Sequence, residues 1–343
     1  MSFISRSYRS IIIAVITVIL AASAAYCQQA KKITVGVSLP TQREERWVRD
    51  ARQLEDEAKK RGIEIKMQIS DNDAMKQVAQ CENLIAGGID ILILAPHDAT
   101  GAAPIVENAH NAGIKVISYD RLILNADCDL YVSFDNEKVG ELQGEFITRT
   151  VPKGNYIILS GSPTDNNAAM FKAGAMKIIK PLADKGDIKI VMEQAVKDWQ
   201  PSEAMKIVEN ALTANDNKID AVLAPNDGTA GGAIQALAAQ KMDGKVTVTG
   251  QDSELSGAQR IAEGSQSMTV FKDTRKLAIA AIDAAEKILS SKEVEITKKI
   301  NNNKSDIPAL LLTPVAVDKS NIDKELIESG YLTKEEVYKN VKK

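Results

Sequence analysis

Short apolar runs alternate with amphipathic, helix-like segments along most of the chain. Residues 33–39 form the first apolar run, and a helical pattern that ends at Gly62 follows it. Several later runs, such as residues 91–95, are apolar at consecutive positions, which indicates strands buried on both faces of a parallel sheet. The alternation occurs in two consecutive series of similar size. We therefore predict an α/β protein with two doubly wound parallel-sheet lobes.

The two series are not separated by a long Gly/Ser-rich or Pro-rich linker. We therefore expect short ordered crossings near residues 134–137, 271–274 and 305–311, which together make a three-crossing hinge. The expected N-terminal lobe comprises residues 31–135 plus 273–306, and the expected C-terminal lobe comprises 136–272 plus 307–343.

The first 26 residues have a different pattern, with Arg6 and Arg9 ahead of the uncharged run 11–26 and small residues at 22–25. This pattern predicts a signal peptide over residues 1–26 and a periplasmic or extracytoplasmic protein. The run is shorter than the roughly 20 residues that span a bilayer. Two alternatives remain for Cys27: lipidation of the mature N-terminus, or cleavage after Ala24 or Ala25 that leaves a spare thiol. Tyr26 departs from the small residue that usually precedes a lipidated cysteine.

Composition and motifs exclude several classes of function. The net charge of −3 gives no basic footprint for nucleic acid, so no nucleic-acid partner is expected. The two histidines, His97 and His110, are not near a cysteine in the sequence, and neither GxSxG nor HExxH occurs. GxGxxG and GxxxxGK[ST] are also absent from the sequence. We therefore predict a protein that is not an enzyme and needs neither a cofactor nor a metal.

Six apolar runs end on planar or charged hydrogen-bonding residues. In an open α/β sheet, ligands bind beyond the carboxyl ends of the strands, so these side chains are expected to converge. Taken singly, Asp135, Asp227 and Asp273 could instead cap the helices that follow them, and Arg121 could pair with Asp120. Together they suit a neutral polyhydroxylated ligand, whose hydroxyls both donate and accept. The run ends are Asp120/Arg121, Asp135/Asn136, Asp165/Asn166/Asn167, Asn226/Asp227, Gln251/Asp252 and Lys272/Asp273.

Both tryptophans fall at predicted strand-to-helix junctions. Trp47 follows the first strand, and Trp199 comes two residues before Pro201, a residue typical of a helix start. A flat ring at this edge of the sheet suits the C–H face of a sugar. Packing in the core or between lobes is the alternative, because tryptophan is often buried for packing alone.

From Lys32 to about Leu332 the chain resembles the periplasmic sugar-binding proteins of the ribose, galactose and xylose group. The strings that carry the resemblance are EERWVRD (44–50), ISYDR (117–121), YVSFDNEKVGELQ (131–143), GSPTDNNAAMFKAG (161–174), ENALTANDNKIDAV (209–222), NDGTAGGAIQAL (226–237), TGQD (249–252) and the LLTPVAV tail. Within this group the strings are most similar to the branch that binds D-xylose.

The resemblance implies a type I periplasmic binding protein that captures a monosaccharide by hinge closure, with D-xylose as the expected sugar. The implied partner is the membrane permease of an ABC transporter, and the expected state is a monomer. Alternatives are a sugar-sensing receptor for chemotaxis or a signalling kinase, and specificity for another pentose or hexose. The family's ligand-binding positions match Arg46, Trp47, Asp120, Arg121, Asn136, Asn167, Trp199, Asn226, Asp252 and Lys272.

Overall fold

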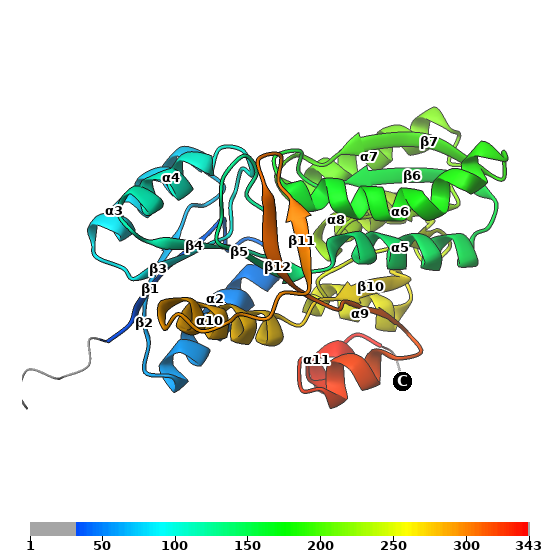
Figure 1. Cartoon of the computed structure of the whole chain (residues 1–343). Coiled ribbons are helices and arrows are strands. Elements are labelled where there is room, and N and C mark those ends of the chain that lie inside the picture. Colours follow the sequence, from blue (N-terminus) through cyan, green and yellow to red (C-terminus); the bar gives the residue numbers. More distant parts are fainter. Residues whose placement is uncertain (1–31, 342–343) are drawn as a thin grey trace, which may run out of the picture. The chain divides into compact units, whose positions relative to one another are not determined.

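The computed structural model describes residues 32–341 (Figure 1). The predicted signal peptide and Cys27 lie outside these residues, so the predictions of export and lipidation stay predictions. Among the helices of the described range, none combines the length and the hydrophobicity that crossing a bilayer requires.

One sheet of seven strands has the order β11-β12-β5-β4-β3-β1-β2. Every neighbouring pair is parallel except β11 with β12, which is antiparallel. The inner strand β3 is fully buried, as its uninterrupted apolar sequence predicts. The bounds are β1 (Thr34–Leu39), β2 (Glu64–Ile69), β3 (Ile91–Leu94), β4 (Lys115–Tyr119), β5 (Leu130–Phe134), β11 (Lys298–Asn301) and β12 (Asp306–Leu312).

A second sheet has four parallel strands in the order β7-β6-β8-β9. Strands β10 and β13 form a separate antiparallel pair. The two mostly parallel sheets confirm the predicted α/β class. The bounds are β6 (Gly154–Ser160), β7 (Ile188–Ala195), β8 (Ala221–Leu223), β9 (Thr247–Val248), β10 (Met268–Phe271) and β13 (Val315–Asp318).

Helices cover both sheets. Residues of α3 and α4 form one core with β3, β4, β5 and β12, while α7 and α8 form another with β6, β8 and β9. Helices α2 and α10 lie side by side, where Arg61 contacts Asp283 and Glu286 (Figure 1). The bounds are α2 (Glu45–Lys60), α3 (Ala74–Ala86), α4 (Ala103–Asn111), α5 (Asn136–Thr150), α6 (Asn166–Asp184), η1 (Lys197–Trp199), α7 (Pro201–Ala214), α8 (Asp227–Ala239), α9 (Leu255–Glu263), α10 (Thr274–Leu289), η2 (Asp323–Glu328) and α11 (Lys334–Val337).

Three chain segments connect the two groups of strands. The first runs from β5 into α5 and the second from β10 into α10, near the expected residues 134–137 and 271–274. The third differs from the expectation, because β12 pairs with β5 in the seven-stranded sheet. Residues 307–312 therefore lie in the first sheet, and the chain crosses at residues 313–314, between β12 and β13.

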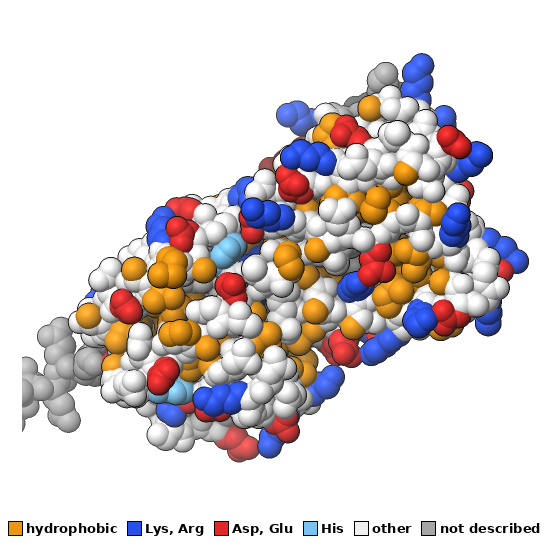
Figure 2. Space-filling model, turned by 90° about the horizontal axis from the view of Figure 1, so that it is seen from above, with side chains coloured by type: hydrophobic (Ala, Val, Ile, Leu, Met, Phe, Trp, Pro, Cys, Tyr) orange, Lys and Arg blue, Asp and Glu red, His pale blue; other side chains and the backbone are white. Residues whose placement is uncertain are grey.

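Charged side chains of both signs are interspersed over the face of the molecule that Figure 2 draws. That face has no large area of a single sign, which agrees with the small net charge of −3.

Candidate functional site

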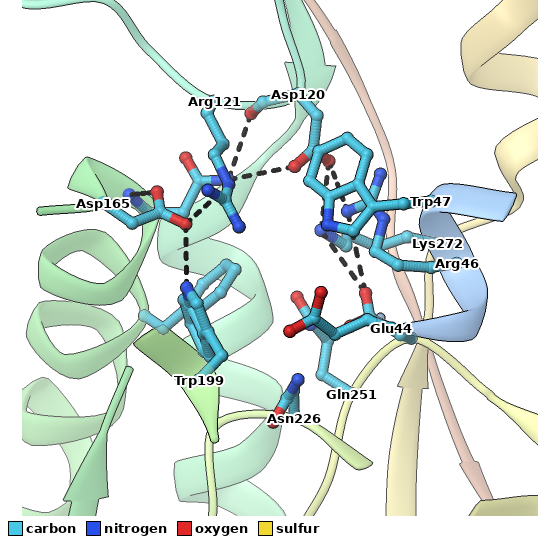
Figure 3. A pocket seen from close by; sticks show the side chains of 13 residues that line it. Glu44, Arg46, Trp47, Asp120, Arg121, Asp165, Trp199, Asn226, Gln251 and Lys272 are labelled. Carbon is cyan, nitrogen blue, oxygen red and sulfur yellow. Dashed lines mark hydrogen bonds and ion pairs between the residues drawn. The ribbon is translucent and has the colours of Figure 1, made fainter. Parts of the chain in front are cut away.

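A pocket is lined by residues from the carboxyl ends of strands in both sheets (Figure 3). It contains every ligand-binding residue predicted from the sequence except Asn136. The cavity between these residues has a volume of about 20 Å³. The lining residues are Glu44, Arg46, Trp47, Asp120, Arg121, Asp165, Asn167, Phe171, Trp199, Asn226, Gln251, Asp252 and Lys272.

Asp120 is the charged centre of the pocket. It follows β4 with a positive φ of 57°, a conformation that Asp tolerates better than most residues. Its Oδ1 accepts hydrogen bonds from Arg46 Nη1 at 2.8 Å and from Lys272 Nζ at 3.2 Å. Burial alone would raise the pKa of Asp120, but the charges of Arg46 and Lys272 outweigh it and hold that pKa well below its usual range. Asp120 is therefore a buried carboxylate in the ionised form.

Arg46 is held from behind by a second carboxylate. Its Nη2 and Nε donate to Asp50 Oδ2 at 2.7 and 3.0 Å, and the Tyr119 hydroxyl donates to Asp50 Oδ1 at 2.5 Å. Arg46 and Asp50 are four residues apart on α2, so the helix itself sets this pairing. Burial would lower the pKa of Arg46, but Asp120 and Asp50 raise it, so the guanidinium stays charged.

Asp252 faces the same two cations at a greater distance. Its Oδ1 lies 3.7 Å from Arg46 Nη1 and 3.7 Å from Lys272 Nζ. Burial raises the pKa of Asp252, and these two cations lower it in part. Because its ion pairs are long, the carboxylate keeps more capacity than Asp120 to accept hydrogen bonds from a ligand.

Asp165 joins Arg121 to Trp199. Arg121 Nε lies 2.8 Å from Asp165 Oδ2, and Trp199 Nε1 donates to the same oxygen at 3.2 Å (Figure 3). Arg121 thus pairs with Asp165 and not with Asp120, the partner considered in the sequence analysis. Burial raises the pKa of Asp165, and the charge of Arg121 opposes this effect.

The two indole rings have different surroundings. Trp47 has two guanidinium groups against its ring, with Arg46 at 4.3 Å and Arg121 at 5.1 Å from the centroid. Trp199 has a positive φ of 57° and an edge contact with Phe171 at 6.3 Å between centroids. A Cβ on Gly161 would lie 2.0 Å from the Trp199 ring, so the absence of a side chain at Gly161 makes room for the indole.

Asn136 lies behind the pocket and does not line it. Its Nδ2 donates to the Tyr131 hydroxyl at 2.9 Å and to Asn167 Oδ1 at 3.1 Å. Asn167 in turn donates to the Asp120 carbonyl oxygen at 3.1 Å. Asn136 therefore positions Asn167, which does line the pocket.

The capping alternative applies to some of the predicted residues. Asp135 and Asp273 do cap α5 and α10 through their side chains. Asp227 does not cap α8, because Asn226 Oδ1 accepts from Thr229 N at 2.9 Å at that position. Asn226 both caps the helix and lines the pocket, so the two interpretations do not exclude each other.

Four lining residues are not among the binding positions that the family resemblance implied: Glu44, Asp165, Phe171 and Gln251. Asp165 and Gln251 were still expected near the site, because they stand at the ends of apolar runs, whereas Glu44 and Phe171 were not singled out. Glu44 is the N-cap residue of α2, two residues before Arg46. Phe171 lies inside α6, where an aromatic residue has no feature that separates it from a core residue.

Comparisons with known proteins agree with this geometry. The model of the periplasmic binding protein domain matches residues 35–293. The D-xylose-binding periplasmic protein of Haemophilus influenzae is 46% identical over 90% of this chain and 93% of its own length. The protein of the same name from Escherichia coli is 46% identical over 88% of this chain and 92% of its own.

A solved structure gives the same result. The carbohydrate transporter solute-binding protein of Chloroflexus aurantiacus, in complex with D-glucose, superposes with a TM-score of 0.83 at 36% identity, covering 90% of this chain and 98% of that one. The resemblance and the fold class expected from the sequence are thereby confirmed. The chain belongs to the periplasmic binding protein family, whose members bind solutes and are not enzymes.

Proposed function

We propose that this protein is an extracytoplasmic receptor that captures a monosaccharide, D-xylose first of all, and delivers it to the permease of an ABC transporter. The observation that carries the proposal is the pocket, in which carboxylates, amides and cations from both sheets converge beside two indole rings. The two relatives named for D-xylose, each 46% identical over most of both chains, support that sugar.

The polar groups suit a neutral sugar. Asp120 and Asp252 accept from hydroxyls, Arg46, Arg121 and Lys272 donate, and Asn167 and Asn226 do both. Hydrogen bonds to charged groups contribute roughly 1.5–3 kcal/mol each, and leaving such a group unpaired in a closed site costs a similar amount. A sugar that lacks one hydroxyl is therefore rejected more strongly than its smaller area would predict.

Capture by hinge closure follows from where the charges stand. Arg46 lies on α2 and Asp120 follows β4, both beside the seven-stranded sheet, whereas Asp252 and Lys272 follow β9 and β10. Two of their ion pairs, Arg46–Asp252 and Lys272–Asp120, join these two groups. A sugar that contacts both groups at once stabilises the closed arrangement. In this proposal the permease recognises the surface of the closed form.

The lobes of this proposal are those expected from the sequence, with the third crossing moved to residues 313–314. Their hinge would consist of the connections β5–α5, β10–α10 and β12–β13. The predicted signal peptide, together with the two relatives named periplasmic, supports a location outside the cytoplasm.

Calorimetric titration of the mature protein tests the proposal. D-xylose is compared with D-ribose, L-arabinose, D-glucose and D-galactose, and D-glucose is included because the Chloroflexus relative holds it. Micromolar or tighter binding of D-xylose is the expected result. Binding of another sugar and not of D-xylose would leave the receptor function standing with a different ligand. No measurable binding of any of the five sugars would reject the proposal.

A further inference from the structure

Glu44 extends into the pocket from the start of α2, where it occupies the N-cap position without capping the helix through its side chain. Its side chain is only 8% exposed. One carboxylate oxygen, Oε1, accepts from Arg43 Nε at 3.2 Å and from Arg43 Nη2. Arg43 Nη2 also donates a hydrogen bond to the carbonyl oxygen of Asp198. The carboxylate of Glu44 is therefore fixed in place and its charge is balanced.

The other oxygen of Glu44, Oε2, is buried and accepts no hydrogen bond from the described residues. Gln251 Oε1, which belongs to the same pocket, is buried and unpaired in the same sense. Figure 3 shows these two side chains together with Asn226, on the opposite side of the pocket from Asp120 and Arg121. Both atoms can only accept, and a buried acceptor that receives no hydrogen bond is unfavourable. This side of the pocket is therefore built for a ligand group that donates.

The same side of the pocket adjoins a second cavity of about 240 Å³. Glu44 and Trp199 line both cavities, and Pro201, Gln235 and Arg260 are among the residues of the second. The pocket can thus receive a substituent that projects from a sugar ring past Glu44. Because Arg43 already balances the Glu44 charge, a neutral hydroxyl suits this position better than an ammonium group.

We propose that Glu44 is a specificity-determining residue whose free oxygen accepts a hydrogen bond from the hydroxymethyl group of a hexopyranose. This inference rests on the proposed function. D-glucose and D-xylose in their pyranose forms share the ring and the configuration of its hydroxyls, and they differ by one hydroxymethyl group. With Glu44, the receptor binds D-glucose in addition to D-xylose, and with a similar affinity.

Calorimetry on three proteins with three sugars tests the inference. The proteins are the wild type, Glu44→Leu, which removes the acceptor, and Glu44→Gln, which keeps a carbonyl oxygen. The sugars are D-xylose, D-glucose and 6-deoxy-D-glucose, which retains the projecting carbon but loses its hydroxyl. In the wild type, removal of this hydroxyl lowers affinity tenfold or more. In Glu44→Leu the two hexoses bind within about threefold of each other, and the affinity for D-glucose falls by a larger factor than the affinity for D-xylose. Glu44→Gln keeps the preference for D-glucose over 6-deoxy-D-glucose.

Several outcomes would overturn the inference. One is wild-type binding of D-xylose without D-glucose, and another is equal binding of D-glucose and 6-deoxy-D-glucose by the wild type. A third is an equal loss of D-xylose and D-glucose in Glu44→Leu, which would make Glu44 a general contact. In each of these the proposed function survives, whereas a wild type that binds no sugar rejects both proposals. The comparison of the two hexoses on the wild type needs no variant, so it decides even if Glu44→Leu folds poorly.

Discussion

Asp120 and Asp227 are both buried carboxylates that follow a parallel strand, yet their surroundings are opposite in kind. Asp120 faces the cations Arg46 and Lys272, at 2.8 and 3.2 Å. The Asp227 carboxylate receives hydrogen bonds from neutral groups: Gln266 Nε2 at 2.7 Å, Glu254 N at 2.9 Å and the Thr269 hydroxyl at 3.0 Å. The pKa of Asp120 is held well below its usual range, whereas burial raises the pKa of Asp227 to about 7 and the charge of Arg260 offsets this only in part.

The difference separates a carboxylate that faces the pocket from one that supports it. Asp227 lines only the neighbouring cavity, and its backbone N–H donates to the Gln251 carbonyl oxygen at 2.9 Å. Together with its bond from Glu254 N, this contact holds the loop that carries Gln251 and Asp252. A Cβ on Gly257 would lie 2.4 Å from the Asp227 carboxylate, so the surrounding backbone is closed tightly around it.

The largest effect is expected for Asp120→Asn, which leaves Arg46 and Lys272 buried without their shared counter-charge. Sugar affinity should fall a hundredfold or more, about 2.7 kcal/mol, in a calorimetric titration. Asp56→Asn is the matched control, because Asp56 is 52% exposed on the same chain and should leave affinity unchanged. Wild-type affinity in Asp120→Asn would remove Asp120 from the site and end the contrast with Asp227.

Asp227→Asn should act on stability and not on binding. All three side-chain contacts of Asp227 require an acceptor, and an asparagine turns one of its atoms into a donor that faces another donor. We expect the free energy of unfolding in urea to fall by about 2 kcal/mol, with sugar affinity within about threefold of wild type. A loss of affinity as large as that of Asp120→Asn would show that the two carboxylates do not differ in role.

Asp252→Ala sharpens the comparison within the pocket itself. The ion pairs of Asp252, at 3.7 Å, are longer than those of Asp120. Asp252 therefore stabilises the free protein less, and Arg46 and Lys272 keep Asp120 as a counter-charge when Asp252 is removed. Sugar affinity should fall tenfold or more, about 1.4 kcal/mol, with the melting temperature of the free protein nearly unchanged. Equal affinities of wild type and variant would exclude Asp252 as a ligand contact.

Much of this arrangement was predictable because parallel strands bring their carboxyl ends to one edge. Asp120, Asn167, Asp252 and Lys272 all reach the pocket for that reason. The same pattern did not show which of two adjacent residues faces the pocket. At Asn226 and Asp227 the first lines the pocket and the second faces the neighbouring cavity, a choice set by the start of α8.

Other features depend on contacts between residues far apart in the chain. The position of Asn136 behind Asn167 follows from the hydroxyl of Tyr131, and the pairing of Arg121 with Asp165 joins residues 44 positions apart. The third crossing was placed too early because the apolar run 307–312 is compatible with a strand in either sheet. Only its pairing with β5 decides between them.

The smallest expected effect is a pH dependence that belongs to Asp227 alone. Its pKa is about 7 in the folded protein and near 3.8 in the absence of the fold, so between these values the folded state holds a proton that the unfolded state has lost. Ionisation in this interval therefore favours unfolding. The stabilisation is complete below about pH 4 and is lost as the pH rises through 7.

From pH 6.5 to 7.5 the wild type should lose less than about 1 kcal/mol relative to Asp227→Asn, because one proton changes stability by at most about 1.4 kcal/mol per pH unit. Urea denaturation of both proteins at pH 6.5, 7.0 and 7.5 measures this difference, in which the titration of all other groups cancels. If the difference in free energy of unfolding between the two proteins stays constant with pH, Asp227 is already ionised in the folded protein. Its three neutral donors would then stabilise an ionised carboxylate as well as the two cations around Asp120 do.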